Sequence, residues 1–296
     1  MNQDLTILRE IADGASVHPT AVIGPFCVVG PQAVIGPRTV LGRRVSVIGR
    51  TTVGADNVID DDCVLGAVPQ DLKYVGRKTY LFIGDRNRFG PRVTAHIGTE
   101  PGGYLTRIGH DNVLEAGAHV AHDCFVDDHA FLGPGVLLAG HIRVMQGAVV
   151  HEHVGVHHFT TIGPYSEVGP RTPVRRDVPP FAFFTSHGYY TSPPAVTGLS
   201  ERGVVAAGLS DQDAAQLRQA FASLFDNDHA QDPRVRRMLA QADLAQPVRL
   251  LCQFLLDSLQ GTFGRYRENF RGQIPPEARQ HFPPEILAEI ERAAAK

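Results

Sequence analysis

The sequence predicts a mainly-β fold in which short parallel strands stack in successive coils, followed by a small α-helical domain. Three observations point to it. Aliphatic residues recur at every sixth position in two long series, Gly and Pro are frequent at 30 and 21 of 296 residues, and helix-start signals are confined to the last third of the chain. This composition suits a chain with frequent corners better than a helical bundle.

The six-residue repeat is the main signal. The first series contains Ile11, Val17, Ile23, Val29, Ile35, Leu41, Val47, Val53, Ile59 and Leu65, and the second contains Ile108, Leu114, Val120, Val126, Leu132, Leu138, Val144, Val150, Val156, Ile162, Val168 and Val174. A period of six fits neither a helix nor a simple hairpin, but it suits a short strand plus a corner with one aliphatic pointing inward. Each coil then pairs with the next, so the strands are parallel.

The repeat is interrupted between its two series. After Leu65 the phase pauses, reappears at Ile83 and Phe89, and is reset by an insertion near Gly98–Arg107. The pattern is that of the hexapeptide-repeat proteins. This resemblance implies a left-handed parallel β-helix with about 18 residues per coil, and homotrimers whose sites lie between subunits.

The repeat ends near Pro179. The Pro- and aromatic-rich stretch 179–194 is predicted to be a linker packed along the last coils. We therefore expect a β-helix domain over 1–188, and a linker with an α-helical domain over 189–296.

The helical domain carries separate start signals. Ser210 and Asp213 resemble a capping box before a first helix, and Asp232–Pro233 opens a second. An apolar stripe that begins at Val248 predicts a third helix, and Pro283–Lys296 is expected to form a short final one.

Charge and cysteine usage limit the class of protein. The net charge is −3 without a large block of one sign, so we expect no nucleic-acid partner and no embedding in a membrane. No signal pattern or membrane-spanning apolar run is present in the sequence, and we expect a cytoplasmic protein. The cysteines are far apart and fit reduced thiols better than disulfides: Cys27, Cys63, Cys124 and Cys252.

Histidines gather in the second series of repeats. His119, His122 and Asp123 lie within Ala118–Cys124, and three more histidines follow: His141, His157 and His158. If one coil has about 18 residues, His122, Gly140 and His158 form one column along the coils. Asp123, His141 and Phe159 form the neighbouring column. Such a ridge can line a cleft against another subunit.

Several interpretations of this ridge are possible. The histidines could be solvated corner residues, or His119, His122 and Cys124 could bind zinc, although neighbouring strand residues point to opposite sides. Cys124 could also be a nucleophile, but its place in the repeat favours packing in a corner. The alternative is acid–base chemistry: Asp123 would fix the tautomer of His122, and Gly140 would leave room for a backbone N–H at an oxyanion.

Five sequence blocks carry a closer resemblance. They are Gly66–Tyr74 (GAVPQDLKY), Gly84–Arg88 (GDRNR), Ile108–Asn112 (IGHDN), Ala118–Cys124 (AHVAHDC) and Leu138–His141 (LAGH). In this order they resemble the acyl-carrier-protein-dependent UDP-N-acetylglucosamine O-acyltransferase family of lipid A biosynthesis, from about Gly14 to Gly203. The resemblance implies an acyl carrier protein as partner, UDP-N-acetylglucosamine or a related sugar nucleotide as acceptor, and a homotrimer. It implies no cofactor and no metal, since the acyl group is carried on the phosphopantetheine arm of the acyl carrier protein.

The resemblance also implies roles for individual residues. His122 would be the general base for the sugar 3-hydroxyl, Asp123 would orient it, and the Gly140 N–H would hold the oxyanion. Positions that contact the sugar nucleotide or the acyl donor in the family are occupied here by Asp71, Lys73, His96, His119, His141, His157, His158 and Arg202.

The chain departs from the family in its recognition residues. Ile97 replaces an Arg of the family, and Glu201 replaces an Arg that faces a phosphate. Pro170 replaces the glycine that acts as the acyl-chain ruler, and His158 stands where Gln is common. The residues at Gly90–Arg92 also differ, and the C-terminus extends beyond the usual end. Pro170 predicts a shortened acyl groove. Two alternative functions remain. One is a paralogue that acts on another sugar nucleotide, an amino sugar or a different acyl donor, and the other is a non-catalytic trimeric scaffold.

Overall fold

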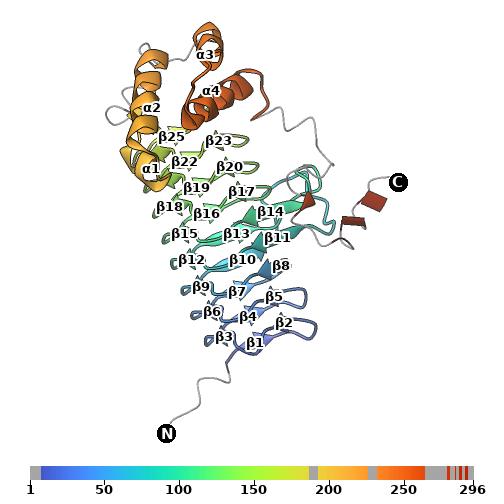
Figure 1. Ribbon diagram of the computed structural model, residues 1–296. Coiled ribbons are helices and arrows are strands. Elements are labelled where there is room, and N and C mark those ends of the chain that lie inside the picture. The colour runs from blue at the N-terminus through green and yellow to red at the C-terminus, as the bar shows by residue number, and fades with distance from the viewer. Residues whose placement is uncertain are drawn as a thin grey trace.

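The computed structural model of the chain describes residues 8–186, 193–225 and 232–263, together with 279, 280, 284, 287, 288, 291 and 292. Its larger part is a stack of coils, each made of three short strands joined by corners (Figure 1). Strands of successive coils pair in parallel and form three sheets that run the length of the stack. The predicted parallel β-helix with a small helical region after it is confirmed.

Along the stack, each sheet takes every third strand of the chain, except at the end of the third sheet, where β24 is followed by β26 and β27. The first sheet contains β1 (Glu10–Ile11), β4 (Val28–Val29), β7 (Ser46–Val47), β10 (Val64–Ala67), β13 (Thr94–His96), β16 (His119–Val120), β19 (Leu137–Leu138), β22 (Gly155–Val156) and β25 (Pro173–Val174). The second contains β2 (Ser16–Val17), β5 (Val34–Ile35), β8 (Arg50–Val53), β11 (Tyr80–Ile83), β14 (Leu105–Ile108), β17 (Phe125–Val126), β20 (Arg143–Val144) and β23 (Thr161–Ile162). The third contains β3 (Val22–Ile23), β6 (Val40–Leu41), β9 (Val58–Ile59), β12 (Arg88–Phe89), β15 (Val113–Leu114), β18 (Phe131–Leu132), β21 (Val149–Val150), β24 (Glu167–Val168), β26 (Ala182–Thr185) and β27 (Ala195–Leu199).

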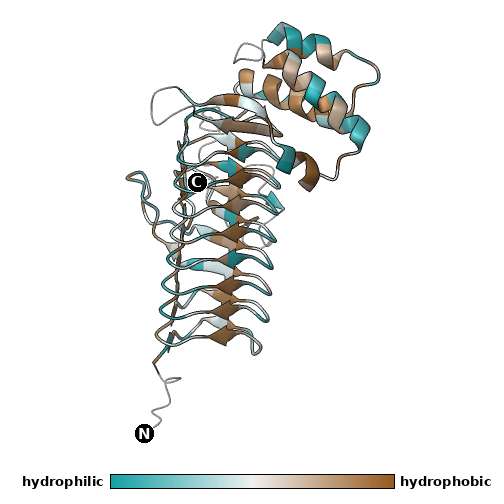
Figure 2. Ribbon diagram, turned by 90° about the vertical axis from the view of Figure 1, so that its left-hand side faces the viewer, coloured by the Kyte–Doolittle hydropathy of each residue, from teal (hydrophilic) through white to brown (hydrophobic). Residues whose placement is uncertain are grey.

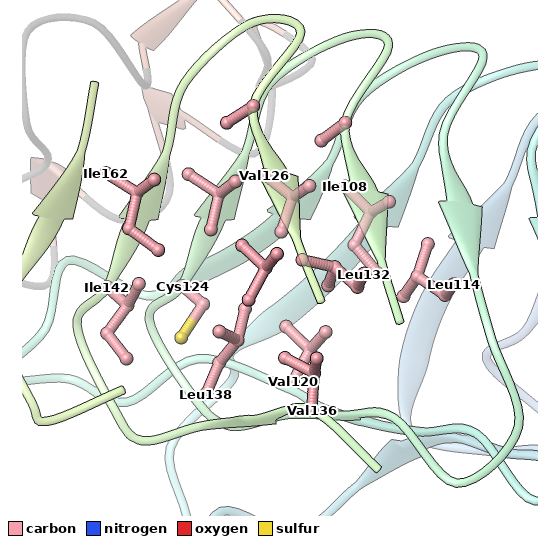
Figure 3. Packing of buried hydrophobic residues seen from close by; sticks show 14 of the residues in the cluster. Ile108, Leu114, Val120, Cys124, Val126, Leu132, Val136, Leu138, Ile142 and Ile162 are labelled. Atoms are coloured by element: carbon pink, nitrogen blue, oxygen red, sulfur yellow. The ribbon is translucent and has the colours of Figure 1, made fainter. Parts of the chain in front are cut away.

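The aliphatic residue of each hexad points into the coil. In the middle of the stack these side chains are fully buried, as for Leu114, Val126 and Leu132 (Figure 3). Ile11, in the first strand, is 40% exposed because no coil precedes it. The buried aliphatic rows along the stack account for the hydrophobic strands seen in Figure 2. Burial of these rows is the main stabilising term of the fold.

Two coils are longer than the others. His119 pairs with Leu137 at the regular spacing. Loops intervene between Val64 and its partner Thr94, and between Thr94 and its partner His119, so these partners lie further apart in the sequence. The first loop follows β10 and ends before Tyr80, and the second occupies residues 97–104. The insertion expected near Gly98–Arg107 is therefore shorter than predicted, since its last residues belong to β14.

The predicted linker is partly a strand. β26 pairs in parallel with β24, and β27 pairs with it in antiparallel orientation, so the third sheet continues past residue 188. Phe181 and Phe184 are buried and cover the last coil, which explains why an aromatic stretch extends the sheet.

The helices are α1 (Glu201–Ala206), α2 (Asp211–Leu224), α3 (Asp232–Leu239) and α4 (Gln246–Leu259). The capping prediction is confirmed: the Ser210 side chain accepts a hydrogen bond from the Asp213 N–H. α1, which Ser200 caps in the same way, was not predicted from the sequence. The described residues within the expected final helix are helical, but most of that segment lies outside the described residues. Among the described helices, none has both the length and the apolarity to cross a membrane.

Candidate active site

The histidine ridge lies at the corners that follow the first sheet. Backbone hydrogen bonds connect successive coils there: the His141 N–H donates to the His122 carbonyl at 3.1 Å, and the Phe159 N–H to the Gly140 carbonyl at 3.2 Å. The rings of His141 and Phe159 stack at 4.4 Å between centroids. The two predicted columns are therefore present in the structure.

His122 and Asp123 form a buried pair at this corner. His122 Nδ1 lies 2.7 Å from Asp123 Oδ2, and the Asp123 side chain is completely buried. The carboxylate also accepts hydrogen bonds from the Thr99 N–H at 2.8 Å and the Thr99 hydroxyl at 2.7 Å. With Nδ1 committed to the carboxylate, the lone pair of a neutral His122 is on Nε2, as a general base requires.

Two threonines that hold this pair were missed by the sequence analysis. Besides Thr99, the Thr106 hydroxyl accepts a hydrogen bond from the Asp123 N–H at 2.8 Å. Thr99 precedes Asp123 by 24 residues, more than a regular coil, because the rest of the 97–104 loop lies between them. Thr106 precedes Asp123 by 17 residues, one short of a regular coil, so it lies in the neighbouring column. The one available signal was that the repeat breaks where Thr99 lies.

Gly140 is fixed by its contact with His122. A Cβ at Gly140 would lie 2.5 Å from His122 Cε1 and 2.7 Å from Nε2, so any side chain would displace the imidazole. Gly140 is buried, and its N–H donates no backbone hydrogen bond within the described part of the chain. A buried N–H beside the reactive nitrogen of a histidine is a suitable donor for an oxyanion.

His119, in the same coil as His122, forms a second pair with His96 of the preceding coil. His119 Nδ1 is 2.7 Å from the Thr94 hydroxyl, and its ring meets that of His96 edge-to-face at 5.0 Å. Burial lowers the pKa of His96 to about 4, and it lowers the pKa of His119 as well. Neutral imidazoles at neutral pH can accept or donate a hydrogen bond to a polar ligand.

A groove of about 690 Å³ runs along the outer face of the first sheet from this ridge. Its middle is lined by small or apolar residues, including Ala121, Leu137, Ala139 and Gly155, and its polar lining includes His119, His122, His157 and Arg175. Gln70, from the loop after β10, also lines it. An apolar channel that starts at a buried His–Asp pair can hold an aliphatic chain with its reactive end at the histidine.

Asp71 comes close to the ridge from the same loop. Ligand atoms of Asp71, His122 and His141 lie within 4.8 Å of one another, so these three residues are the described group that could hold a cation. The zinc site of His119, His122 and Cys124 that the sequence suggested is not assembled, because Cys124 is buried in the core (Figure 3). The Cys124 thiol donates a hydrogen bond to the Ala139 carbonyl at 3.0 Å. The same burial removes Cys124 as a nucleophile.

Lys73 and Arg202 do not line the groove. Lys73 is exposed on the loop, with its N–H bonded to Asp71. His157 and His158 continue the ridge one coil beyond Gly140, with ring centroids 3.9 Å apart and the rings tilted. The Arg202 guanidinium lies over the Phe131 ring, beside the third sheet. Within one chain, Arg202 is thus not part of the groove.

The residues at which the chain departs from the pattern it resembles do not line the groove. Pro170 is exposed at the corner between the third and first sheets and does not line the groove. Ile97 is buried in the core. Glu201 forms a two-point ion pair with Arg218, at 3.0 and 2.6 Å, so its reversed charge is neutralised within the helical region.

Comparisons with known proteins agree with this architecture. No family model matches the chain. An acyl-[acyl-carrier-protein]–UDP-N-acetylglucosamine O-acyltransferase from Verminephrobacter eiseniae is 46% identical over 215 residues, which cover 73% of this chain and 80% of that protein. One of the same name from Synechocystis is 38% identical over 62% of this chain and 64% of its own length.

Solved structures of the same kind superpose on most of the chain. LpxA from Acinetobacter baumannii is 31% identical with a TM-score of 0.78, covering 87% of this chain and 96% of its own. The UDP-N-acetylglucosamine acyltransferase of Francisella novicida is 25% identical with a TM-score of 0.78, over 86% and 90% of the two chains. The chain belongs to the acyl-[acyl-carrier-protein]–UDP-N-acetylglucosamine O-acyltransferase family.

Proposed function

We propose that the protein transfers an acyl group from an acyl carrier protein thioester to the 3-hydroxyl of UDP-N-acetylglucosamine, the first acylation of lipid A biosynthesis. The observation that carries the proposal is the buried His122–Asp123 pair, with Nε2 of His122 facing Gly140 at the start of an apolar groove. Family membership supplies the substrates, and the geometry supports the reaction class. A non-catalytic scaffold has no need of this arrangement.

The chemistry is a nucleophilic acyl substitution that passes through a tetrahedral intermediate. His122 Nε2 removes the proton of the sugar hydroxyl as its oxygen attacks the thioester carbonyl carbon. The Gly140 N–H stabilises the oxyanion of the tetrahedral intermediate. When the intermediate collapses, the C–S bond breaks, and the imidazolium returns the proton to the departing pantetheine sulfur. Asp123 keeps His122 in the required tautomer and stabilises the imidazolium.

The sugar nucleotide would bind at the other side of the ridge. Asp71, from the loop after β10, and His141, from the next coil, lie beside His122. His96, from the preceding coil, packs against His119. Donors and acceptors of this kind suit the hydroxyl and amide groups of an amino sugar. Lys73 and Arg202 are the cationic candidates for the diphosphate, and since Arg202 lies far from the groove of its own chain, it would act on the site of a neighbouring subunit.

This separation supports a homotrimeric enzyme with composite sites. His157, His158 and the rest of the ridge face outward along one side of the stack, where a threefold-related chain would complete the cleft. Mixing His122→Ala protein with Arg202→Ala protein should then restore some activity in hybrid trimers. A fully active monomer in light scattering would exclude composite sites.

Pro170 as the stop of the acyl groove is a separate proposal. It is exposed in the single chain and would contact an acyl tail only if a neighbouring subunit continued the groove over that corner. Each methylene that loses burial forfeits about 0.8 kcal/mol, so the proposal implies a steep preference for donors of about ten carbons or fewer. Pro170→Gly should admit longer donors. A parent enzyme that prefers fourteen-carbon donors, unchanged in the variant, contradicts it.

The decisive experiment uses the full-length protein with UDP-N-acetylglucosamine and a panel of 3-hydroxyacyl carrier proteins. Mass spectrometry should detect an acylated sugar nucleotide whose ester is absent with the His122→Ala protein. A parallel incubation with the 3-amino analogue of the sugar nucleotide tests the paralogue hypothesis raised by Ile97 and Glu201. If neither acceptor is acylated, the proposed function is wrong.

A further inference from the structure

The loop at residues 97–104 sets the geometry of Asp123. Thr99 provides two of the hydrogen bonds to the carboxylate, and Gly102 lies so close that a Cβ there would overlap the Asp123 carboxyl group. The Gly102 N–H donates to the Thr99 hydroxyl at 3.1 Å. A small movement of this loop would therefore move the carboxylate and, with it, the ring of His122.

The loop is closed by two tyrosines. The Tyr104 N–H donates to the Thr99 carbonyl at 2.8 Å, and Tyr104 has a φ of 70°, in the left-handed region that the regular corners of the stack also use. The Gly98 N–H donates to the Tyr80 carbonyl at 3.0 Å, and the Tyr80 N–H to the Tyr104 carbonyl at 2.9 Å. The turn is held by these backbone hydrogen bonds and by the residues that surround the two tyrosines.

Those surroundings are an aromatic cluster separate from the core of the coils. Tyr80, Tyr104 and Phe125 are each 5% exposed, Leu105 is fully buried, and Phe82 packs at the edge. Phe125 lies two residues after Asp123, so the cluster adjoins both the loop and the carboxylate.

Among the described residues, one more side chain that packs on this cluster comes from the C-terminal part of the chain. Leu287 is half-buried and packs against the cluster, although it lies beyond α4 in the sequence. Figure 1 shows described parts of this C-terminal segment beside β11 and β14. Arg279 and Glu291 form an ion pair at 2.9 Å on either side of Leu287.

We propose that Leu287 acts as a strap: its side chain holds the aromatic cluster, and through it the 97–104 loop, in the position that orients Asp123. Leu287 and Tyr104 are then positioning residues for the acyl transfer proposed above. The strap belongs to the part of the chain that extends beyond the usual end of the family.

Leu287→Asp in the full-length protein tests this, with Ala288→Asp as the matched control, since Ala288 is its exposed neighbour. Hydrogen exchange of the peptide covering 97–104 should become faster in Leu287→Asp, and kcat should fall on the order of 10- to 100-fold with little change in KM, because a misplaced catalytic group loses rate rather than binding. Leu287→Met should keep the exchange rate of 97–104 and kcat near the parental values, and Leu287→Ala should give an intermediate loss of kcat. Exchange in the coils 8–65 and the Tm of the coils should stay at the parental level.

The exchange and kinetic results decide different questions. If Leu287→Asp leaves both the exchange of 97–104 and kcat unchanged, or if Ala288→Asp has the same effect as Leu287→Asp, there is no strap. If the parent protein transfers no acyl group, the proposed function fails, while the exchange of 97–104 still decides whether Leu287 holds the loop.

Discussion

His110–Asp111 and His122–Asp123 are the same dipeptide at two corners of the coil stack, in nearly the same backbone conformation, with φ of 57° for Asp111 and 60° for Asp123. Their surroundings differ. The side chains of His110 and Asp111 are 39% and 29% exposed, whereas those of His122 and Asp123 are 10% and 0% exposed. A left-handed corner that tolerates Asp is thus a feature of the fold and does not by itself make a catalytic pair.

The difference comes from what each carboxylate contacts. Asp111 accepts two hydrogen bonds from Arg86, at 2.8 Å each, on the surface of the stack. Asp123 is covered by the 97–104 loop and bonded to Thr99 and His122. A buried carboxylate needs such donors, because burial without them is costly, and they fix its orientation. The inserted loop, rather than the corner, therefore makes the second pair suitable for chemistry.

Replacing each histidine with alanine separates the two corners most strongly. His122→Ala should lower the rate of acyl transfer on the order of 10²–10⁴-fold, the usual contribution of a general base. The matched variant His110→Ala should keep the parental rate. Steady-state kinetics measures both, and Tm should stay near the parental value in each because neither ring belongs to the aliphatic rows. Equal rates for the two variants would show that His122 is not the base.

The outcome also bears on how much of this site is visible in the sequence. The six-residue period fixed which side chains point inward, and the column of His122 and Gly140 followed from a regular coil. Thr99 could not be placed against Asp123, because the loop between them breaks the period. The strand β26 was also missed, since Pro and aromatic residues suggested a linker while their burial at the end of the stack makes them part of the third sheet.

Gly140→Ala tests whether the corner must remain open above His122. The added methyl group would lie 2.5 Å from His122 Cε1, so the ring must shift, and a shift of about 1 Å can cost on the order of 10²-fold in kcat. Gly198→Ala is the control, because a Cβ at Gly198 meets no atom within 4 Å. Kinetics of the two variants should differ accordingly. A parental kcat for Gly140→Ala would mean that the imidazole is not held where the structure has it.

Acid should destabilise the surroundings of His96, beside the active-site ridge, and the corner at Asp111 in different pH ranges. Burial lowers the pKa of His96 to about 4, below the value of about 6.5 in an unfolded chain, so the unfolded state binds more protons and stability is lost as the pH falls from 6.5 towards 4. The hydrogen bonds from Arg86 lower the pKa of Asp111, so its contribution is lost only at pH values below the ordinary carboxyl range. Measured across pH 7 to 4.5, the Tm of His96→Leu should fall less than that of the parent. Parallel curves would contradict the assignment of this window to His96.

The smallest effect is expected when each corner carboxylate loses a donor. Arg86→Ala removes an exposed partner of Asp111, and water and salt replace it readily, so Tm and kcat should remain close to parental values. Thr99→Val removes one hydroxyl from Asp123 but leaves a buried carboxylate oxygen short of a donor, which costs about 1–3 kcal/mol. The Thr99 variant should therefore show a lower Tm and a lower kcat than the Arg86 variant, although Arg86 carries the charge. If Arg86→Ala were the more damaging of the two, burial of the second His–Asp pair would not be what distinguishes these corners.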